Sequence, residues 1–203
     1  MKVFYLILVP ACRNIYLAAV LCLAPHAGAA IRVVEDAGRV RVTWPISAQE
    51  TGSAVFSMDE SKPLIESLGV AATGGEMKTI VSGFTPVTLL TVGSRDLDKP
   101  AGWVAFFDNP PKRPHETFPV KLGKRALQVS EGKSRTTVRL AEASAGSFHG
   151  ELRFTFYQNS GLLKAETVLP TEDDGRAIVY DTGLASANPT WQATVWNDAD
   201  GKL

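Results

Sequence analysis

Short runs in which apolar and polar residues alternate recur along most of the chain after residue 30. Glycine, proline, aspartate and asparagine separate these runs. Alternation with a period of two is typical of antiparallel strands, because successive side chains of a strand point to opposite faces of the sheet. The pattern predicts an all-β protein, an antiparallel β-sandwich with at most one short helix. We expect strands at 31–35, 39–44, 54–58, 64–70, 77–82, 86–93, 102–107, 125–131, 135–142, 150–157, 162–169, 176–181 and 191–196.

One segment also fits a short helix. Ser61 has the character of a helix N-cap, Pro63 suits the first turn, and Gly69 suits the end. We favour a strand over this segment, because the pattern on both sides of it is β.

Two hairpins can be registered from the side chains. In the first, Gly132-Lys133 forms a two-residue type II′ turn that pairs Val129 with Thr136. The same register pairs Leu127 with Val138.

The second hairpin joins 150–157 to 162–169. Pairing Phe154 with Ala165 gives one apolar face and places Arg153 opposite Glu166 on the other, where opposite charges stabilise the register. If the chain then turns back, strand 176–181 lies beside this pair and completes a three-stranded meander, with Ile178 and Tyr180 on the core side.

This meander resembles those of galactose-mutarotase-like β-supersandwiches. The resemblance lies in Gly150-Glu151-Leu152-Arg153-Phe154-Thr155-Phe156-Tyr157 and Leu162-Leu163-Lys164-Ala165-Glu166-Thr167-Val168. It covers roughly 35 residues and implies a large, supersandwich-like fold and a carbohydrate context. It transfers no catalytic residue, since the family's catalytic histidines have no counterparts here.

The first thirty residues have the organisation of an export signal. Apolar blocks at Val3–Val9 and Ile15–Ala24 lie on either side of Arg13, and the segment ends on small residues at Ala27–Ala30. Neither block reaches the roughly 18 to 20 residues of a membrane span. We therefore expect residues 1–30 to be a signal peptide and the mature protein to be secreted or periplasmic.

Composition narrows the class of partner. Both cysteines, Cys12 and Cys22, lie in the predicted signal, so the mature chain has no thiol; Leu21 stands where a lipoprotein signal needs a small residue. Removing Lys2 and Arg13 leaves 19 basic against 21 acidic residues, a net charge of −2. Without a basic excess, nucleic acid is not an expected partner. The length of 31–203 fits a single domain.

Metal and serine-hydrolase chemistry are not favoured. Residues 197–201 imitate part of a calcium loop, but the alignment puts Trp196 at the first ligand position. The acidic run 172–175 is typical of a solvated turn. After the predicted signal the only histidines are His115 and His149, which do not have zinc-ligand spacing, and no G-x-S-x-G motif occurs. We expect no metal and no cofactor.

Carboxylates on strands are the remaining catalytic candidates, as a pair for glycoside chemistry. These acids are Glu66, Glu151, Glu166 and Asp181. Glu66 shares its predicted face with Leu64, Leu68 and Val70, and burial there would raise its pKa. An edge position or an ion pair is the alternative explanation, and Glu166 already has Arg153 as a structural partner.

Tryptophans are the last candidates, because indole rings stack on sugars. We interpret Trp44, Trp103, Trp191 and Trp196 as core residues, with sugar stacking as the alternative. Trp191 and Trp196 are five positions apart and point to opposite faces of a regular strand, so at most one is buried in the same core.

The leading hypothesis is a non-catalytic secreted β-sandwich domain that accompanies carbohydrate-active machinery and binds glycan through Arg153, Tyr157, Lys164 and Glu166. One alternative is a glycoside hydrolase or lyase that uses carboxylates; another is a purely structural or partner-binding module. The predicted strand 191–196 leads into a turn with few residues after it. We therefore expect residues 31–203 to be the amino-terminal part of a longer protein, or to need a partner strand at this C-terminal edge.

Overall fold

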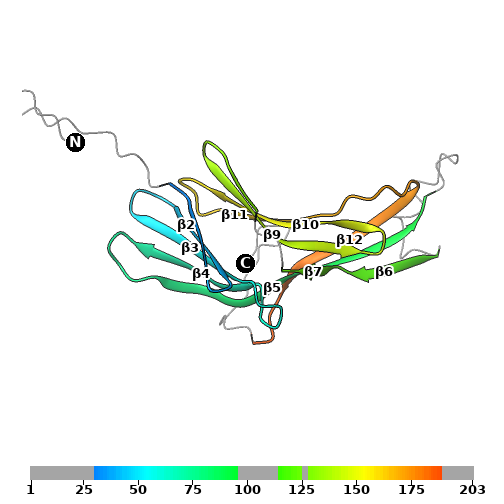
Figure 1. The fold of residues 1–203 in the computed structure, drawn as a ribbon, viewed down its shortest axis with the longest axis horizontal. Coiled ribbons are helices and arrows are strands. Elements are labelled where there is room, and N and C mark those ends of the chain that lie inside the picture. The colour runs from blue at the N-terminus through cyan, green and yellow to red at the C-terminus, as the bar shows by residue number, and fades with distance from the viewer. Residues whose placement is uncertain (1–29, 96–113, 125–127, 189–203) are drawn as a thin grey trace, which may run out of the picture.

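The computed structural model describes residues 30–95, 114–124 and 128–188, and within them every paired strand is antiparallel and no helix occurs. The predicted all-β sandwich is confirmed (Figure 1). The first sheet has seven strands in the order β1-β2-β3-β4-β5-β12, and β6 also pairs with β5. Its strands are β1 (Arg32–Asp36), β2 (Arg39–Pro45), β3 (Glu50–Ser57), β4 (Ile65–Ala72), β5 (Lys78–Ser94), β6 (His115–Pro119) and β12 (Arg176–Ala185).

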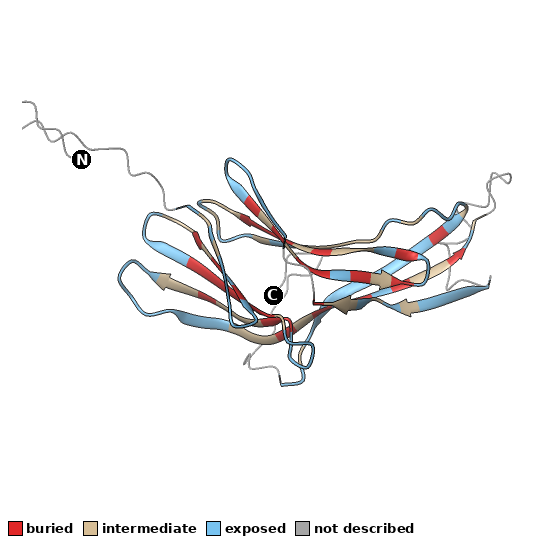
Figure 2. Ribbon diagram, viewed as in Figure 1, coloured by how far each residue is buried: buried red, intermediate tan, exposed pale blue. Residues whose placement is uncertain are grey.

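The second sheet has five strands in the order β11-β10-β9-β7, and β8 also pairs with β9. The two sheets face each other, and their inner faces carry most of the buried residues (Figure 2). The strands are β7 (Lys121–Gly123), β8 (Gln128–Glu131), β9 (Arg135–Ala145), β10 (Phe148–Tyr157) and β11 (Leu163–Val168).

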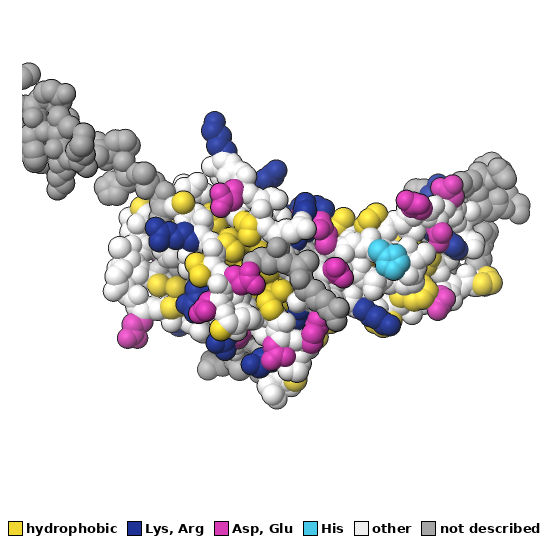
Figure 3. All heavy atoms as spheres, in the orientation of Figure 1, with side chains coloured by type: hydrophobic (Ala, Val, Ile, Leu, Met, Phe, Trp, Pro, Cys, Tyr) yellow, Lys and Arg dark blue, Asp and Glu magenta, His cyan; other side chains and the backbone are white. Residues whose placement is uncertain are grey.

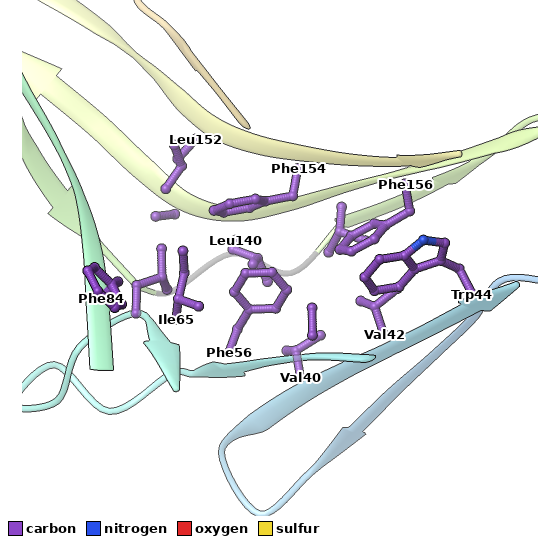
Figure 4. Close-up of a cluster of buried hydrophobic side chains, with 14 residues drawn as sticks. Val40, Val42, Trp44, Phe56, Ile65, Phe84, Leu140, Leu152, Phe154 and Phe156 are labelled. Atoms are coloured by element: carbon purple, nitrogen blue, oxygen red, sulfur yellow. The ribbon is translucent and has the colours of Figure 1, made fainter. Parts of the chain in front are cut away.

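The main core lies between β2 to β5 of the first sheet and β9 and β10 of the second (Figure 4). Phe56 and Phe154 meet with ring centroids 4.7 Å apart, and Trp44 meets Phe156 at 4.9 Å. The Trp44 indole N–H donates to the carbonyl of Ser160 at 2.9 Å, which satisfies the one polar group that this ring buries. The core interpretation of Trp44 is confirmed, since it is 5% exposed.

Strand β5 links this core to a second, smaller one. Phe84 belongs to the main core, whereas Leu90 packs in the smaller cluster with Ala145 and Phe148. Gly83, directly before Phe84, has φ +72°, a conformation that glycine adopts without strain, and the strand continues through it. The breaking residues around Gly83 predicted two strands, 77–82 and 86–93; the structure has one of 17 residues.

Two tight turns set the register of their hairpins. Ala37 and Gly38 join β1 to β2 with φ of +46° and +75°, the two positive values of a type I′ turn. Gly146-Ser147 joins β9 to β10 with positive φ at the glycine alone, as in a type II′ turn. Alanine is strained at positive φ, so Ala37 carries a local cost in a turn that favours asparagine or glycine.

The hairpin between β10 and β11 is confirmed from Leu152 opposite Thr167 to Phe156 opposite Leu163, with Arg153 opposite Glu166. The register of the other hairpin was wrong. Val129 pairs with Val138, two positions from its predicted partner Thr136, and Gly132 lacks the positive φ of a type II′ turn. This register replaces a valine–threonine pair with two branched aliphatic side chains and leaves residues 132–134 between β8 and β9. Leu127 lies outside the described residues.

The predicted position of the third strand of the meander was also wrong. β12 pairs with β5 in the other sheet, where Asp181 lies opposite Leu89. Tyr180 is 67% exposed and Ile178 is 36% exposed, so neither is a core residue. The sequence pattern predicts that β12 turns back and pairs beside β11. Instead, all ten residues of β12 pair with the long strand β5.

Of the remaining strand predictions, some are confirmed and some lie outside the described residues, and two strands were missed. Strand over helix is confirmed at Ile65–Ala72, with residues 58–64 as a loop. Strands β6 and β7 were missed, because prolines next to both hide the alternation. The predicted strands 102–107 and 191–196, with Trp103, Trp191, Trp196 and the loop 197–201, lie outside the described residues.

Candidate functional site

The predicted ligand-binding residues lie on one face. Arg153 and Tyr157 of β10 alternate with the buried Phe154 and Phe156, so their side chains point to the outer face of the second sheet. Glu166 lies opposite Arg153 on β11, and Lys164 lies opposite Thr155. The structure therefore brings all four residues into one polar stripe.

Each charged residue predicted in this stripe already has an ion-pair partner. Arg153 pairs with Glu151 on its own strand rather than with Glu166, and Arg139 of β9 lies 3.2 Å from the same carboxylate. Glu166 pairs with Lys164 at 2.6 Å. The expected pair of Arg153 with Glu166 is thus correct as a register and wrong as an ion pair, because each has an opposite charge two positions away on its own strand. A ligand would have to compete with these partners.

The candidate carboxylates do not form a catalytic pair. Glu66 lies on the outer face of the first sheet, bonded to Arg39 at 2.7 Å, and the ion-pair explanation of this residue is confirmed. Glu151 and Glu166 lie on the opposite side of the core, each in its own ion pair. Asp181 lies on β12 beside the exposed Leu89. The core separates Glu66 from the other two glutamates, so it cannot act together with either on one bond.

A hollow of about 180 Å³ opens on the outer face of the first sheet, over β2, β3, β4 and the start of β5. We call it the β2–β5 hollow. Its polar lining consists of Arg39, Arg41, Ser53, Glu66, Ser67 and Thr79. Alternation exposes this face because Val40, Val42 and Ala54, the neighbours of its arginines and serine, point into the core.

Polar groups in the β2–β5 hollow are free to meet a ligand. The side chain of Arg41 is exposed and has no ion pair or hydrogen bond with any residue that the structure describes. The hydroxyls of Ser53, Ser67 and Thr79 likewise have no hydrogen-bond partner within the described ranges. Ser53 is only 5% exposed, although it lines the hollow.

Apolar groups complete this lining. Val55 and Met77 border the hollow, and Met77 is 45% exposed. Gly69 allows the methionine to lie there, since a Cβ at Gly69 would come within 3.0 Å of the Met77 sulfur and 2.8 Å of the Lys78 carbonyl oxygen. The hollow therefore presents hydroxyl, guanidinium and thioether groups together.

A buried lysine, which the sequence pattern did not single out, is structural. Lys124 is 8% exposed, and its ammonium donates to the carbonyls of Asp59, at 2.7 Å, and Lys62. Its backbone N–H donates to the Glu60 carboxylate at 2.8 Å. Burial lowers the pKa of Lys124, and the charges of Glu60 and Asp59 oppose that shift. These bonds fasten the end of β7 to the loop before β4.

The acidic turn after β11 has structural partners too. Asp173 accepts hydrogen bonds from the Ser147 hydroxyl at 2.6 Å and from Arg176 at 3.0 Å, and both lower its pKa. This supports the interpretation of residues 172–175 as a turn. Within the ranges that the structure describes, no three histidine, cysteine, aspartate or glutamate side chains gather into a metal-binding group.

Charges of both signs lie interspersed on the face of the molecule that Figure 3 shows. In the described part of the chain no helix is long and apolar enough to cross a bilayer. What sets the β2–β5 hollow apart is that the unpaired Arg41 shares one concave surface with free hydroxyl groups.

Sequence reasoning missed this hollow. The available signal was the pair Arg39 and Arg41, which alternate with buried valines, but a pattern along one strand does not show which neighbours neutralise them. No protein-family model matches the chain, and no curated protein matches it.

Proposed function

We propose that this protein is a non-catalytic, secreted β-sandwich domain that binds glycan and accompanies carbohydrate-active machinery. The observation that carries the proposal is the β2–β5 hollow, whose free hydroxyls and exposed methionine suit a sugar ring. Sugars offer hydroxyls to polar partners and C–H surfaces to apolar ones. The resemblance of β10 and β11 to galactose-mutarotase-like domains supports the same carbohydrate context.

The ion pairs of the strand carboxylates favour binding over catalysis. Glycoside hydrolysis needs two carboxyl groups that flank one bond and are free to act on it. Glu66, Glu151 and Glu166 are instead each bonded to a cationic side chain.

A glycan array combined with reducing-sugar release assays tests this function. We expect binding to one class of glycan without release of reducing ends. Release of reducing ends without unsaturated ends would favour the hydrolase, and reducing ends formed together with unsaturated non-reducing ends would favour the lyase. Binding to no glycan would reject the proposal.

Export is a separate part of this proposal. The small residues at 27–30 predict that the mature protein begins at Ala30 or Ile31. The intact mass of exported protein tests the prediction. A mature chain that retains Cys22 with added lipid mass would contradict it.

A second candidate function is partner binding through β12. β12 pairs with β5, and no other described strand pairs with the backbone groups of its second edge. Val179, Tyr180 and Leu184 are exposed along it, and proline and lysine, which protect natural edges, are absent from the strand. Light scattering tests this function: self-association that Val179→Lys abolishes would support it, and a monomer at all concentrations would favour glycan binding alone.

A further inference from the structure

The β2–β5 hollow has an excess of positive charge. Two arginines and one glutamate line it, and the glutamate is bonded to Arg39. Arg41 is thus left with its full charge and all of its N–H donors unused by the described residues. In the outer stripe of the second sheet, by contrast, each charge that we predicted to bind ligand has a partner.

The pair of Arg39 with Glu66 also fixes the surroundings of Arg41. Glu66 pairs with Arg39 at 2.7 Å, and no ion pair joins it to Arg41. The hydroxyls of Ser53 and Ser67 come from strands β3 and β4 on the same face. A ligand anion at Arg41 would therefore meet guanidinium and hydroxyl donors together.

Size restricts the ligand further. A hollow of about 180 Å³ is smaller than the roughly 300 to 1,000 Å³ of pockets that enclose drug-sized ligands. It suits one ring of a longer glycan, with the C–H face of the ring against Met77 and Val55. The rest of the chain would lie along the open sheet surface.

We propose that the β2–β5 hollow recognises a sugar residue bearing an anionic group, either the carboxylate of a uronic acid or a sulfate ester, through Arg41. The planar guanidinium donates paired hydrogen bonds to such oxygens, which a neutral sugar lacks. This inference rests on the proposed glycan binding and adds the chemical class of the ligand.

The test is calorimetric titration of the mature protein with three oligosaccharides: oligogalacturonate, sulfated oligogalactose and neutral oligogalactose. We expect at least one anionic oligosaccharide to bind about ten-fold or more tightly than the neutral one, with weaker binding at high salt. Whichever anionic arm binds identifies the group. Arg41→Gln should remove the difference.

Lys133→Gln is the matched control, because it removes the same charge from an exposed loop far from the hollow in sequence and in sheet. We expect it to bind as the unmodified protein does. Near-ultraviolet circular dichroism checks that both variants keep the native packing. Arg41→Lys should recover only part of the preference, since an ammonium cannot donate in the same fork.

Contrary results separate the two proposals. Equal binding of neutral and anionic oligosaccharides, unchanged by Arg41→Gln, would overturn the anionic specificity and leave glycan binding in place. Anionic binding that survives Arg41→Gln but is lost in Arg153→Ala would place the ligand on the second sheet and overturn the role of the hollow. If neither these three oligosaccharides nor any glycan of the array binds, both proposals fail.

Discussion

Gly52 should be among the least replaceable residues of the main core. It lies on β3 opposite Trp44 of β2. A Cβ at this position would lie 2.5 Å from Cζ2 and 2.6 Å from Cε2 of the indole ring, far inside van der Waals contact. The ring cannot easily retreat, because it packs against Phe156 and its N–H is bonded to the Ser160 carbonyl.

The cost of Gly52→Ala follows from these contacts. Forcing an extra methyl into a packed core costs about 1 to 3 kcal/mol. Displacing the indole also loses its hydrogen bond, worth about 1 kcal/mol. We therefore expect the free energy of unfolding to fall by about 2 to 4 kcal/mol. For a chain of this size, that loss corresponds to a lower Tm by about 4 to 16 °C.

Urea denaturation followed by circular dichroism measures this loss, and Gly183→Ala is the control. Gly183 lies on a strand as well, but nothing approaches its Cβ position within 4 Å, so its replacement should change stability by less than about 0.5 kcal/mol. A double-mutant cycle with Trp44→Leu should show a coupling of about 1 to 3 kcal/mol. A loss below about 0.5 kcal/mol for Gly52→Ala, or additive effects in the cycle, would refute the steric argument.

Three further predictions concern stability. Phe154→Ala should lower the free energy of unfolding by about 3 to 5 kcal/mol, because the ring is buried, whereas Arg153→Ala should cost about 1 kcal/mol or less; equal losses by urea denaturation would contradict this contrast. Hydrogen bonds lower the pKa of Asp173 in the folded state, so its carboxylate stabilises the fold above about pH 3.8 and this contribution is lost as the pH falls further. Asp173→Asn should therefore show a smaller loss of stability between pH 4 and pH 2, and an unchanged slope would count against these bonds. Ala37→Asn should raise Tm, because asparagine tolerates positive φ better than alanine; a lower Tm would show that Ala37 is not strained.

The fold class and most strands could be predicted because burial in a sandwich imposes a period of two on the sequence. The hairpin of β10 and β11 is the best example, since its apolar and charged pairs all agree on one register. The path of β12 could not be predicted in this way. Its alternation does not say which sheet it joins, and pairing with β5 depends on residues about 90 positions earlier.

The candidate site was less predictable than the fold. The residues Arg153, Tyr157, Lys164 and Glu166 were correctly placed on one face, but their ion pairs form along the strands rather than across them. The β2–β5 hollow depends on which charges remain unpaired after β2, β3 and β4 have come together. Arg41 differs from Arg39 only because Glu66, 27 positions beyond Arg39, reaches the latter.

The long strand β5 contributes to both hydrophobic cores, so the molecule cannot be separated into two independent halves. Its first half supplies Phe84 to the main core and its second half supplies Leu90 to the smaller one. Thr88 lies between them and shares hydrogen bonds with Thr167 of β11 and Thr182 of β12, so both sheets meet there. Dividing the chain within β5 would remove part of the packing from each core. Neither half is therefore expected to fold when expressed separately, and the two cores should melt together in a single calorimetric transition.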